Sequence, residues 1–144
     1  MEDFRRTDVA ALLLRSALGV MFVAHALLKY IVFTPAGTVQ FFQSLGLPGP
    51  LAYLTIAAEF VGGLMLIVGL YTRTVAFGLL TVLLGAAWAH SGNGWLFTSP
   101  NGGWEYPVFL AVTAVVVGLL GGGRYALRSR TPAQHAGFRL QRAD

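Results

Sequence analysis

Five ionisable side chains fall inside apolar stretches of the sequence or at their ends: His25, Lys29, Glu59, His90 and Glu105. Charged groups are costly inside a bilayer, so they normally face a protein interior or a wet cavity and have partners there. Histidine and glutamate exchange protons when their environment is suitable, and a lysine can hold a negative charge. These residue types predict a polar pocket that binds a small molecule and exchanges protons with it.

The first apolar stretch carries three of the basic side chains of the sequence. At about 100° per residue on a helix, Arg15, His25 and Lys29 share one face, which must point toward other helices. Arg15 lies about 10 Å from the beginning of this stretch, so we expect it to extend toward the interface there as a structural anchor. His25 and Lys29 lie toward the other end, at a depth close to that of Glu59 in the second stretch.

Two interpretations of these charges compete. In the structural one, Glu59 pairs with Lys29 or His25, Glu105 caps a helix, and the buried pair fixes how the helices pack. In the functional one, His25 and Glu59 exchange protons with a bound molecule while Lys29 holds its negative charge. We prefer the functional interpretation for Glu59, since a carboxylate in mid-membrane is costly, and the structural one for Glu105.

The composition excludes several classes of protein. Of 144 residues, 56% are hydrophobic and 11% are charged, whereas an average soluble domain has about 25% charged residues. A soluble enzyme or a nucleic-acid-binding protein is therefore not expected. The absence of cysteine excludes a disulfide framework, a thiolate metal site and a dithiol relay within the chain. The composition indicates a single domain solvated by lipid.

An all-α integral membrane four-helix up-down bundle is predicted over residues 1–127, followed by a basic cytoplasmic tail, 128–144. A helix needs about 20 apolar residues to cross a bilayer, and helices are predicted at about 9–33, 51–71, 74–90 and 105–120. The first begins at a Thr7-Asp8 cap, and because Arg15 interrupts its apolar run it is predicted to be a permanent helix, not a cleaved signal peptide. Residues 37–47 fit a short amphipathic helix on the membrane surface or a simple covering loop.

Lys and Arg outside the predicted spans all lie on one side. They occur in the N-terminal arm, the second loop and the C-terminal tail, whereas the first and third loops have none: Arg5, Arg6, Arg73, Arg124, Arg128, Arg130, Arg139 and Arg142. The positive-inside rule then places both termini in the cytoplasm. We expect a multi-pass protein of the cell membrane, here a bacterial plasma membrane, in contact with membrane lipids and not with nucleic acid.

The sequence disfavours a haem or metal site, because no predicted helix has a His/Glu pair at the i, i+3 or i, i+4 spacing that di-iron bundles use. Small residues recur at the sequence spacing of helix-packing motifs, four or seven positions apart, in the pairs Ala58/Gly62, Glu59/Gly63 and Gly78/Gly85. Such pairs let helices approach closely. They predict either a tight bundle or a face that docks another membrane subunit.

The order of these motifs resembles the DoxX family of small four-helix membrane proteins. The resemblance covers residues 9–127 and rests on LLLRSALGVMFVAHALLKY, FFQSLGLPGP, AAEFVGGLMLIVGLYTRTVAFGLL, WAHSGNGW with WEYP, and GGGRYAL. It implies a four-helix fold and, from some relatives, thiosulfate:quinone oxidoreduction, thiol and oxidant homeostasis or quinone resistance. It points to the same five residues as the topology does.

The leading functional hypothesis is a redox-associated membrane subunit that handles a quinone-like or small anionic species in the outer half of the bilayer. The cofactor that fits this hypothesis is a quinone. The residues expected to form the walls of its binding slot are Phe22, Phe60, Trp88 and Trp95. The alternative is a non-catalytic accessory subunit that packs against a larger respiratory or photosynthetic complex, so its partners are other membrane subunits. A solute or proton carrier is less favoured, because four short helices leave little room for alternating access.

Overall fold

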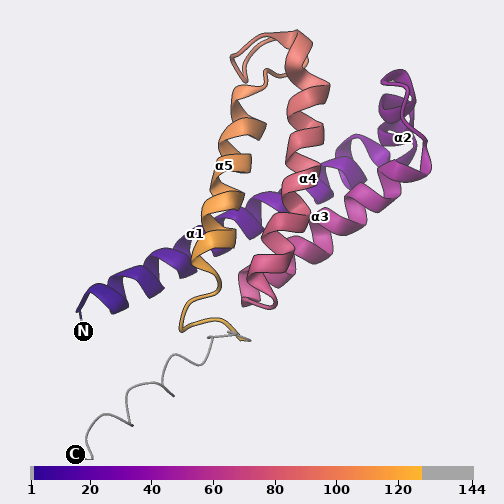
Figure 1. Cartoon of the computed structure of the whole chain (residues 1–144). Coiled ribbons are helices and arrows are strands. Elements are labelled where there is room, and N and C mark those ends of the chain that lie inside the picture. Colours follow the sequence, from indigo (N-terminus) through magenta and orange to yellow (C-terminus); the bar gives the residue numbers. More distant parts are fainter. Residues whose placement is uncertain (1, 128–144) are drawn as a thin grey trace, which may run out of the picture.

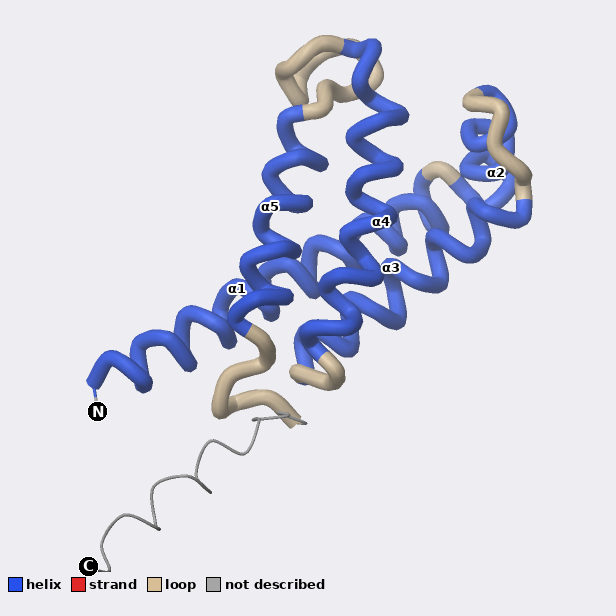
Figure 2. Tube along the Cα trace, viewed as in Figure 1, coloured by secondary structure: helices blue, strands red, loops and turns tan. Residues whose placement is uncertain are grey.

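The computed structural model describes residues 2–127, which form helices and connecting loops without any strand (Figure 2). The all-helical prediction is therefore confirmed for this part of the chain. The predicted basic tail, 128–144, lies outside the described residues. The elements in chain order are α1 (Glu2–Leu27), the π-helical segment η1 (Leu28–Val32), α2 (Thr34–Ser44), α3 (Pro50–Val68), α4 (Thr72–His90), the 3-10 turn η2 (Ser91–Asn93) and α5 (Glu105–Leu120).

Three helical stretches, Arg5–Val32, Pro50–Val68 and Thr72–Asn93, are long and apolar enough to cross a membrane, and Glu105–Leu120 is apolar but shorter. Helix α1 begins at Glu2, before the expected start near residue 9. The predicted cap at Thr7-Asp8 is wrong, because both residues lie within α1; Asp8 Oδ1 instead accepts a hydrogen bond of 2.9 Å from the backbone N–H of Arg124. The short helix that residues 37–47 suggested is present as α2 and begins earlier, at Thr34.

Glycine allows the helices to cross closely. Gly19 of α1 and Gly63 of α3 face each other, and a Cβ on either would lie 2.6–2.7 Å from the carbonyl oxygen of the other. Gly62 packs in the same way against the side chain of Leu79 on α4. The small-residue pairs predicted on the second span are therefore used for packing within the chain, as close helix contacts in lipid require.

The long helices form two pairs, α1 with α3 and α4 with α5, which cross near one end and diverge toward the other (Figure 1). We call the end with the α3–α4 turn the closed end, and the end with α2 and the loop 94–104 the open end. The α3–α4 turn is tight because Gly69 adopts a left-handed conformation (φ 77°) that ends α3. Buried core residues join the pairs: Leu18, Phe22, Leu66, Ala76, Leu79, Leu83, Leu110, Ala111, Ala114 and Val117.

Arg15 holds the closed end together. Its side chain is fully buried, and its guanidinium donates hydrogen bonds to the carbonyls of Leu66 (2.8 Å) and Ile67 in the last turn of α3. It also donates to the carbonyls of Gly122 (3.2 Å) and Tyr125 (2.9 Å), which follow α5. The last carbonyls of a helix lack partners within the helix and carry partial negative charge, so a cation suits this position. The expected extension of Arg15 to the interface is wrong, whereas its anchoring role is confirmed.

We predict that Arg15→Met lowers the free energy of unfolding by about 3 kcal/mol or more, because several buried carbonyls lose a charged donor at once. Arg6→Met is the matched control, since the Arg6 side chain is exposed near the beginning of the same helix, and it should change stability by less than about 0.5 kcal/mol. Denaturant titration in mixed micelles measures both variants. Equal stability of the two variants would show that Arg15 does not hold the closed end.

Candidate functional site

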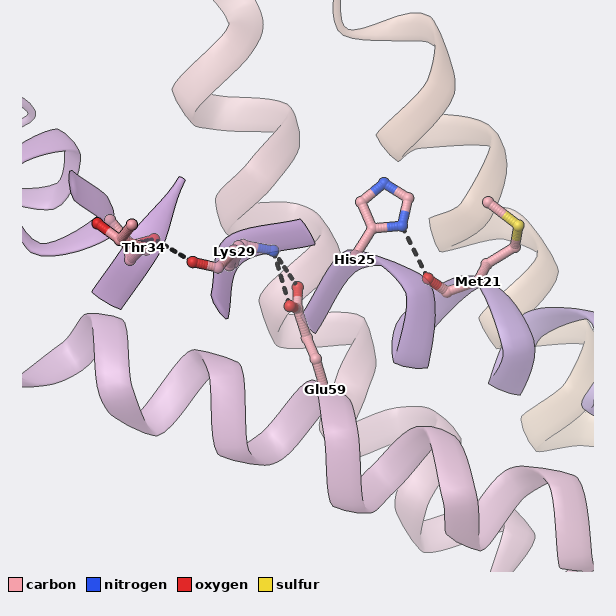
Figure 3. Close-up of polar contacts among 6 residues, drawn as sticks. Met21, His25, Lys29, Thr34 and Glu59 are labelled. Carbon is pink, nitrogen blue, oxygen red and sulfur yellow. Dashed lines mark hydrogen bonds and ion pairs between the residues drawn. The ribbon is translucent and has the colours of Figure 1, made fainter. Parts of the chain in front are cut away.

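Lys29 and Glu59 form an ion pair between η1 and α3. The Lys29 ammonium lies 2.8 Å from Oε1 and 2.7 Å from Oε2 of Glu59 (Figure 3). The Glu59 side chain is 6% exposed and that of Lys29 is 20% exposed, so the pair is shielded on the carboxylate side and reachable on the ammonium side. The pairing that the structural interpretation predicted for Glu59 is thus confirmed, with Lys29 as the partner.

The π-helical segment η1 determines how Lys29 is presented. A π-helix bonds residue i to residue i+5 and is often found at functional sites, because it changes the direction of the side chains that follow. Phe33 N–H donates to the Leu28 carbonyl at 3.0 Å in this pattern. The hydroxyl of Thr38 on α2, a buried residue, lies 3.3 Å from the carbonyl oxygen of Lys29. The short helix α2 therefore packs against the backbone that carries the ion pair.

A cavity of about 640 Å³ opens between the two helix pairs at the open end. Residues from α1, η1, α2, α3, α4 and α5 line it, and most of them are apolar. Polar groups in its wall include His25, Lys29, Glu59, His90 and Tyr106. A concave, mostly apolar site with a few polar groups is the usual form of a small-molecule pocket.

One ring nitrogen of His25 contacts the protein backbone. Its Nδ1 lies 2.8 Å from the carbonyl oxygen of Met21 (Figure 3). Because a carbonyl oxygen can accept and cannot donate, this contact places the proton of a neutral imidazole on Nδ1 and leaves Nε2 as an acceptor. The ring stacks on Tyr106 of α5, with a centroid distance of 5.7 Å and an interplanar angle of 23°.

His90 and Glu105 occupy different surroundings. His90 lines the cavity, stacks on Phe41 of α2 at 6.4 Å, and its Nδ1 lies 3.3 Å from the side-chain amide nitrogen of Asn93. Glu105 is not among the residues that line the cavity; its Oε1 accepts a hydrogen bond of 3.0 Å from Phe97 N–H in the loop 94–104. Glu105 is the first residue of α5, so the predicted carboxylate at a helix N-terminus is confirmed, and its hydrogen bond to Phe97 also ties the loop 94–104 to this helix end.

Two of the four aromatic residues predicted to form the walls of a ligand slot line the cavity. Phe22 and Trp88 line the cavity, whereas Phe60 and Trp95 do not. Phe60 follows Glu59 directly, so the turn of about 100° per residue directs it away from the cavity, and it is 39% exposed. Trp95 lies in the loop and packs edge-on against Trp104, with a centroid distance of 4.5 Å.

Sequence reasoning missed Tyr106 as a member of the site. Its phenolic oxygen is buried and has no hydrogen-bond partner among the described residues. An unmet buried hydroxyl costs about 1–3 kcal/mol, and such exceptions call for an explanation. A tyrosine beside Pro107 at the start of an apolar helix has the sequence pattern of a tyrosine at the membrane interface. The sequence pattern therefore could not distinguish that position from one in the cavity wall.

Gly78 and Gly85 of α4 do not pack against another described helix, so for this pair the tight-bundle alternative is wrong, and the alternative of a face that docks another subunit stays a prediction. Both line the cavity, and a Cβ built at either position has no described atom within 4 Å. Among the described residues, no group of three or more His, Cys, Asp or Glu side chains is placed to hold a metal ion.

Comparisons with known proteins identify relatives. A family model described as DoxX matches residues 10–92, which include His25, Lys29, Glu59 and His90. The chain is 40% identical over 79 residues to "Putative oxidoreductase CatD" of Bacillus subtilis (strain 168), an alignment covering 55% of this chain and 58% of the relative. It is 37% identical over 82 residues to "Inner membrane protein YqjF" of Escherichia coli (strain K12), covering 54% and 62%. The chain therefore spans about three-fifths of the length of these relatives. No solved structure matches it.

We predict that Lys29→Met lowers the free energy of unfolding by about 3–5 kcal/mol, because the buried Glu59 carboxylate loses its partner. Glu59→Gln should be milder than Glu59→Leu, since the amide can still accept a hydrogen bond from Lys29. Glu105→Gln is the control carboxylate outside the cavity, with an expected cost of about 1 kcal/mol for its loop hydrogen bond. Denaturant titration in micelles ranks the variants, and a fully stable Lys29→Met protein would contradict the importance of the pair.

Proposed function

Since the chain belongs to the DoxX family, whose relatives here include an inner membrane protein, we propose that it is a four-span protein of the bacterial cell membrane with both termini in the cytoplasm. In this arrangement α1 with η1, α3, α4 and α5 cross the bilayer, and residues 128–144 form a basic cytoplasmic tail. The Lys and Arg distribution supports the orientation. The cavity at the open end then lies in the outer half of the bilayer.

We propose that this cavity binds a quinone-like molecule as part of a redox reaction. The observation that carries the proposal is the wall of the cavity, in which an ion pair and two histidines border a mostly apolar space. A quinone ring partitions into apolar surroundings, whereas its reduction requires protons. Nε2 of His25 and the Lys29–Glu59 pair supply proton-exchanging groups beside the ring, as general acid–base chemistry requires.

The ion pair refines the role that the sequence suggested for Lys29. Its ammonium binds both oxygens of Glu59, so it is not a free cation for a small anion. A quinone oxygen that gains negative charge on reduction can accept a hydrogen bond from the exposed side of Lys29 while Glu59 keeps the charge balanced. A quinone-like ligand therefore fits the site better than a fully charged anion.

Reduction of a quinone takes two electrons and two protons, and in this proposal a redox partner protein supplies the electrons. The name of the relative from Bacillus subtilis, "Putative oxidoreductase CatD", agrees with a redox role. The alternative, a non-catalytic accessory subunit of a respiratory or photosynthetic complex, is supported by the exposed apolar tip of the loop 94–104, where Trp95, Leu96 and Phe97 are each more than half exposed.

The topology has a direct test. Reporter fusions after residues 48, 73 and 98 should report outside, inside and outside the cell, respectively, because the intervening helices each cross the membrane. Gln43 and Asn101 lie in or beside the two outer connections, so accessibility of cysteines introduced at these positions gives an independent check. Labelling of either position from the cytoplasm alone would overturn the orientation.

Ligand binding can be followed through Trp88, because the sequence has three tryptophans and this one lines the cavity. In a Trp95→Phe/Trp104→Phe background, titration with a benzoquinone should quench Trp88 fluorescence saturably. Adding Tyr106→Phe should weaken binding about two- to tenfold through the loss of one hydrogen bond. The same change should leave unfolding stability equal or higher, because the hydroxyl has no hydrogen-bond partner within residues 2–127.

The matched control is Trp88→Phe, which keeps the Trp95–Trp104 pair outside the cavity and should show no saturable quenching. Unsaturable quenching in every variant would mean that the quinone merely dissolves in the bilayer. That result, together with normal electron flux in a native complex after His25→Ala and Glu59→Gln, would favour the accessory-subunit alternative.

A further inference from the structure

One flank of the cavity is open between α3 and α4. Leu54 on α3 is 65% exposed and Trp88 on α4 is 55% exposed, although both line the cavity. The opposite wall is buried and includes Phe22, Glu59 and Leu110. We call the exposed flank the lateral opening; its residues are Leu51 and Leu54 on α3 and Gly78, Thr81, Gly85 and Trp88 on α4.

The α4 side of this opening is a continuous strip of small residues. Gly78, Thr81, Val82, Gly85, Ala86 and Ala89 line the cavity at the spacing of one helix face. From Gly78 to His90 the strip extends for about 18 Å at the helical rise. Its polar end lies at His90, and its other end, at Gly78, lies past the middle of α4 toward the closed end.

The two glycines in this strip have no packing partner in the described part of the chain. Glycine inside a helix destabilises it by about 1 kcal/mol relative to alanine, and a glycine at a helix crossing is compensated by close packing. Gly19, Gly62, Gly63 and Gly118 all meet a neighbouring helix in this way, whereas Gly78 and Gly85 face empty space in the cavity wall. The room they leave is therefore available to a ligand.

We infer that the ligand of this cavity is a membrane-dissolved amphiphile that enters sideways from the bilayer through the lateral opening. Its polar ring lies near the Lys29–Glu59 pair and His25, and its apolar chain passes along the Gly78–Gly85 strip into the hydrocarbon. The inference rests on the proposed function and specifies its substrate class: a quinone with a long chain, as opposed to a short water-soluble one. The exposed rim at Leu54 and Trp88 is apolar and therefore suits hydrocarbon.

The test compares one benzoquinone ring with and without a ten-carbon chain, using Trp88 quenching in lipid nanodiscs. Gly78→Leu fills the strip at a point where a Cβ meets no described atom, ten positions away from the reporter. It should weaken binding of the chain-bearing quinone about tenfold, which corresponds to about 1.4 kcal/mol, the order of cost for overfilling a site. Binding of the chainless ring should be unchanged. Ala57→Leu is the matched control, because Ala57 is exposed on α3 and does not line the cavity.

Gly85→Leu provides a second obstruction and should show the same selectivity for the chain. If Gly78→Leu and Gly85→Leu weaken both quinones equally, or neither, the inference is wrong while the proposed quinone site stands. If the unsubstituted reporter protein binds neither quinone saturably, the proposed function fails and the inference fails with it. An equal loss in Ala57→Leu would also overturn the inference, since the effect would not come from the strip.

Discussion

The buried guanidinium of Arg15 determines where the two helix pairs meet. It binds carbonyls from the end of α3 and from the segment after α5, so both pairs converge on one side chain. Leu127 N–H adds a bond of 3.1 Å to the Val68 carbonyl nearby. A charge buried this deeply is tolerated because helix C-terminal carbonyls supply partial negative charge in place of water. With the closed end fixed in this way, the diverging helices leave a cavity at the open end.

At the open end a buried charge also needs a partner, and here the partner is a charged side chain. Glu59 is buried and must be paired, and Lys29 supplies the pairing. The pair lies in the cavity wall, with the ammonium more exposed than the carboxylate. Structural and functional interpretations of Glu59 are therefore compatible, because one contact both joins α3 to η1 and presents a polar group to the cavity.

Several features around the cavity carry a local free-energy cost. The Tyr106 hydroxyl is buried without a partner among the described residues, and the two glycines of α4 give up helix stability without packing. The π-helical turn that presents Lys29 is likewise less favourable than a continuous α-helix. Natural proteins depart from such local rules mainly at functional sites, where the rest of the fold compensates for the cost. Their concentration around one cavity favours a binding role over simple packing.

The helical class and the charged residues within the apolar segments could both be predicted from the amino-acid sequence. Both follow from local rules, because apolar length and the cost of charge in lipid depend on residue type alone. It also identified His25, Lys29, Glu59 and His90, all of which line one cavity. Which charges pair could be seen only in the folded chain, as could the contact of Glu105 with its loop and that of Arg15 with α3 and the segment after α5. The same holds for the glycines, because Gly78 and Gly85 face open space whereas Gly62 and Gly63 contact neighbouring helices. These outcomes depend on how two helix pairs cross, and a helical period fixes the face of a residue without fixing what lies opposite that face.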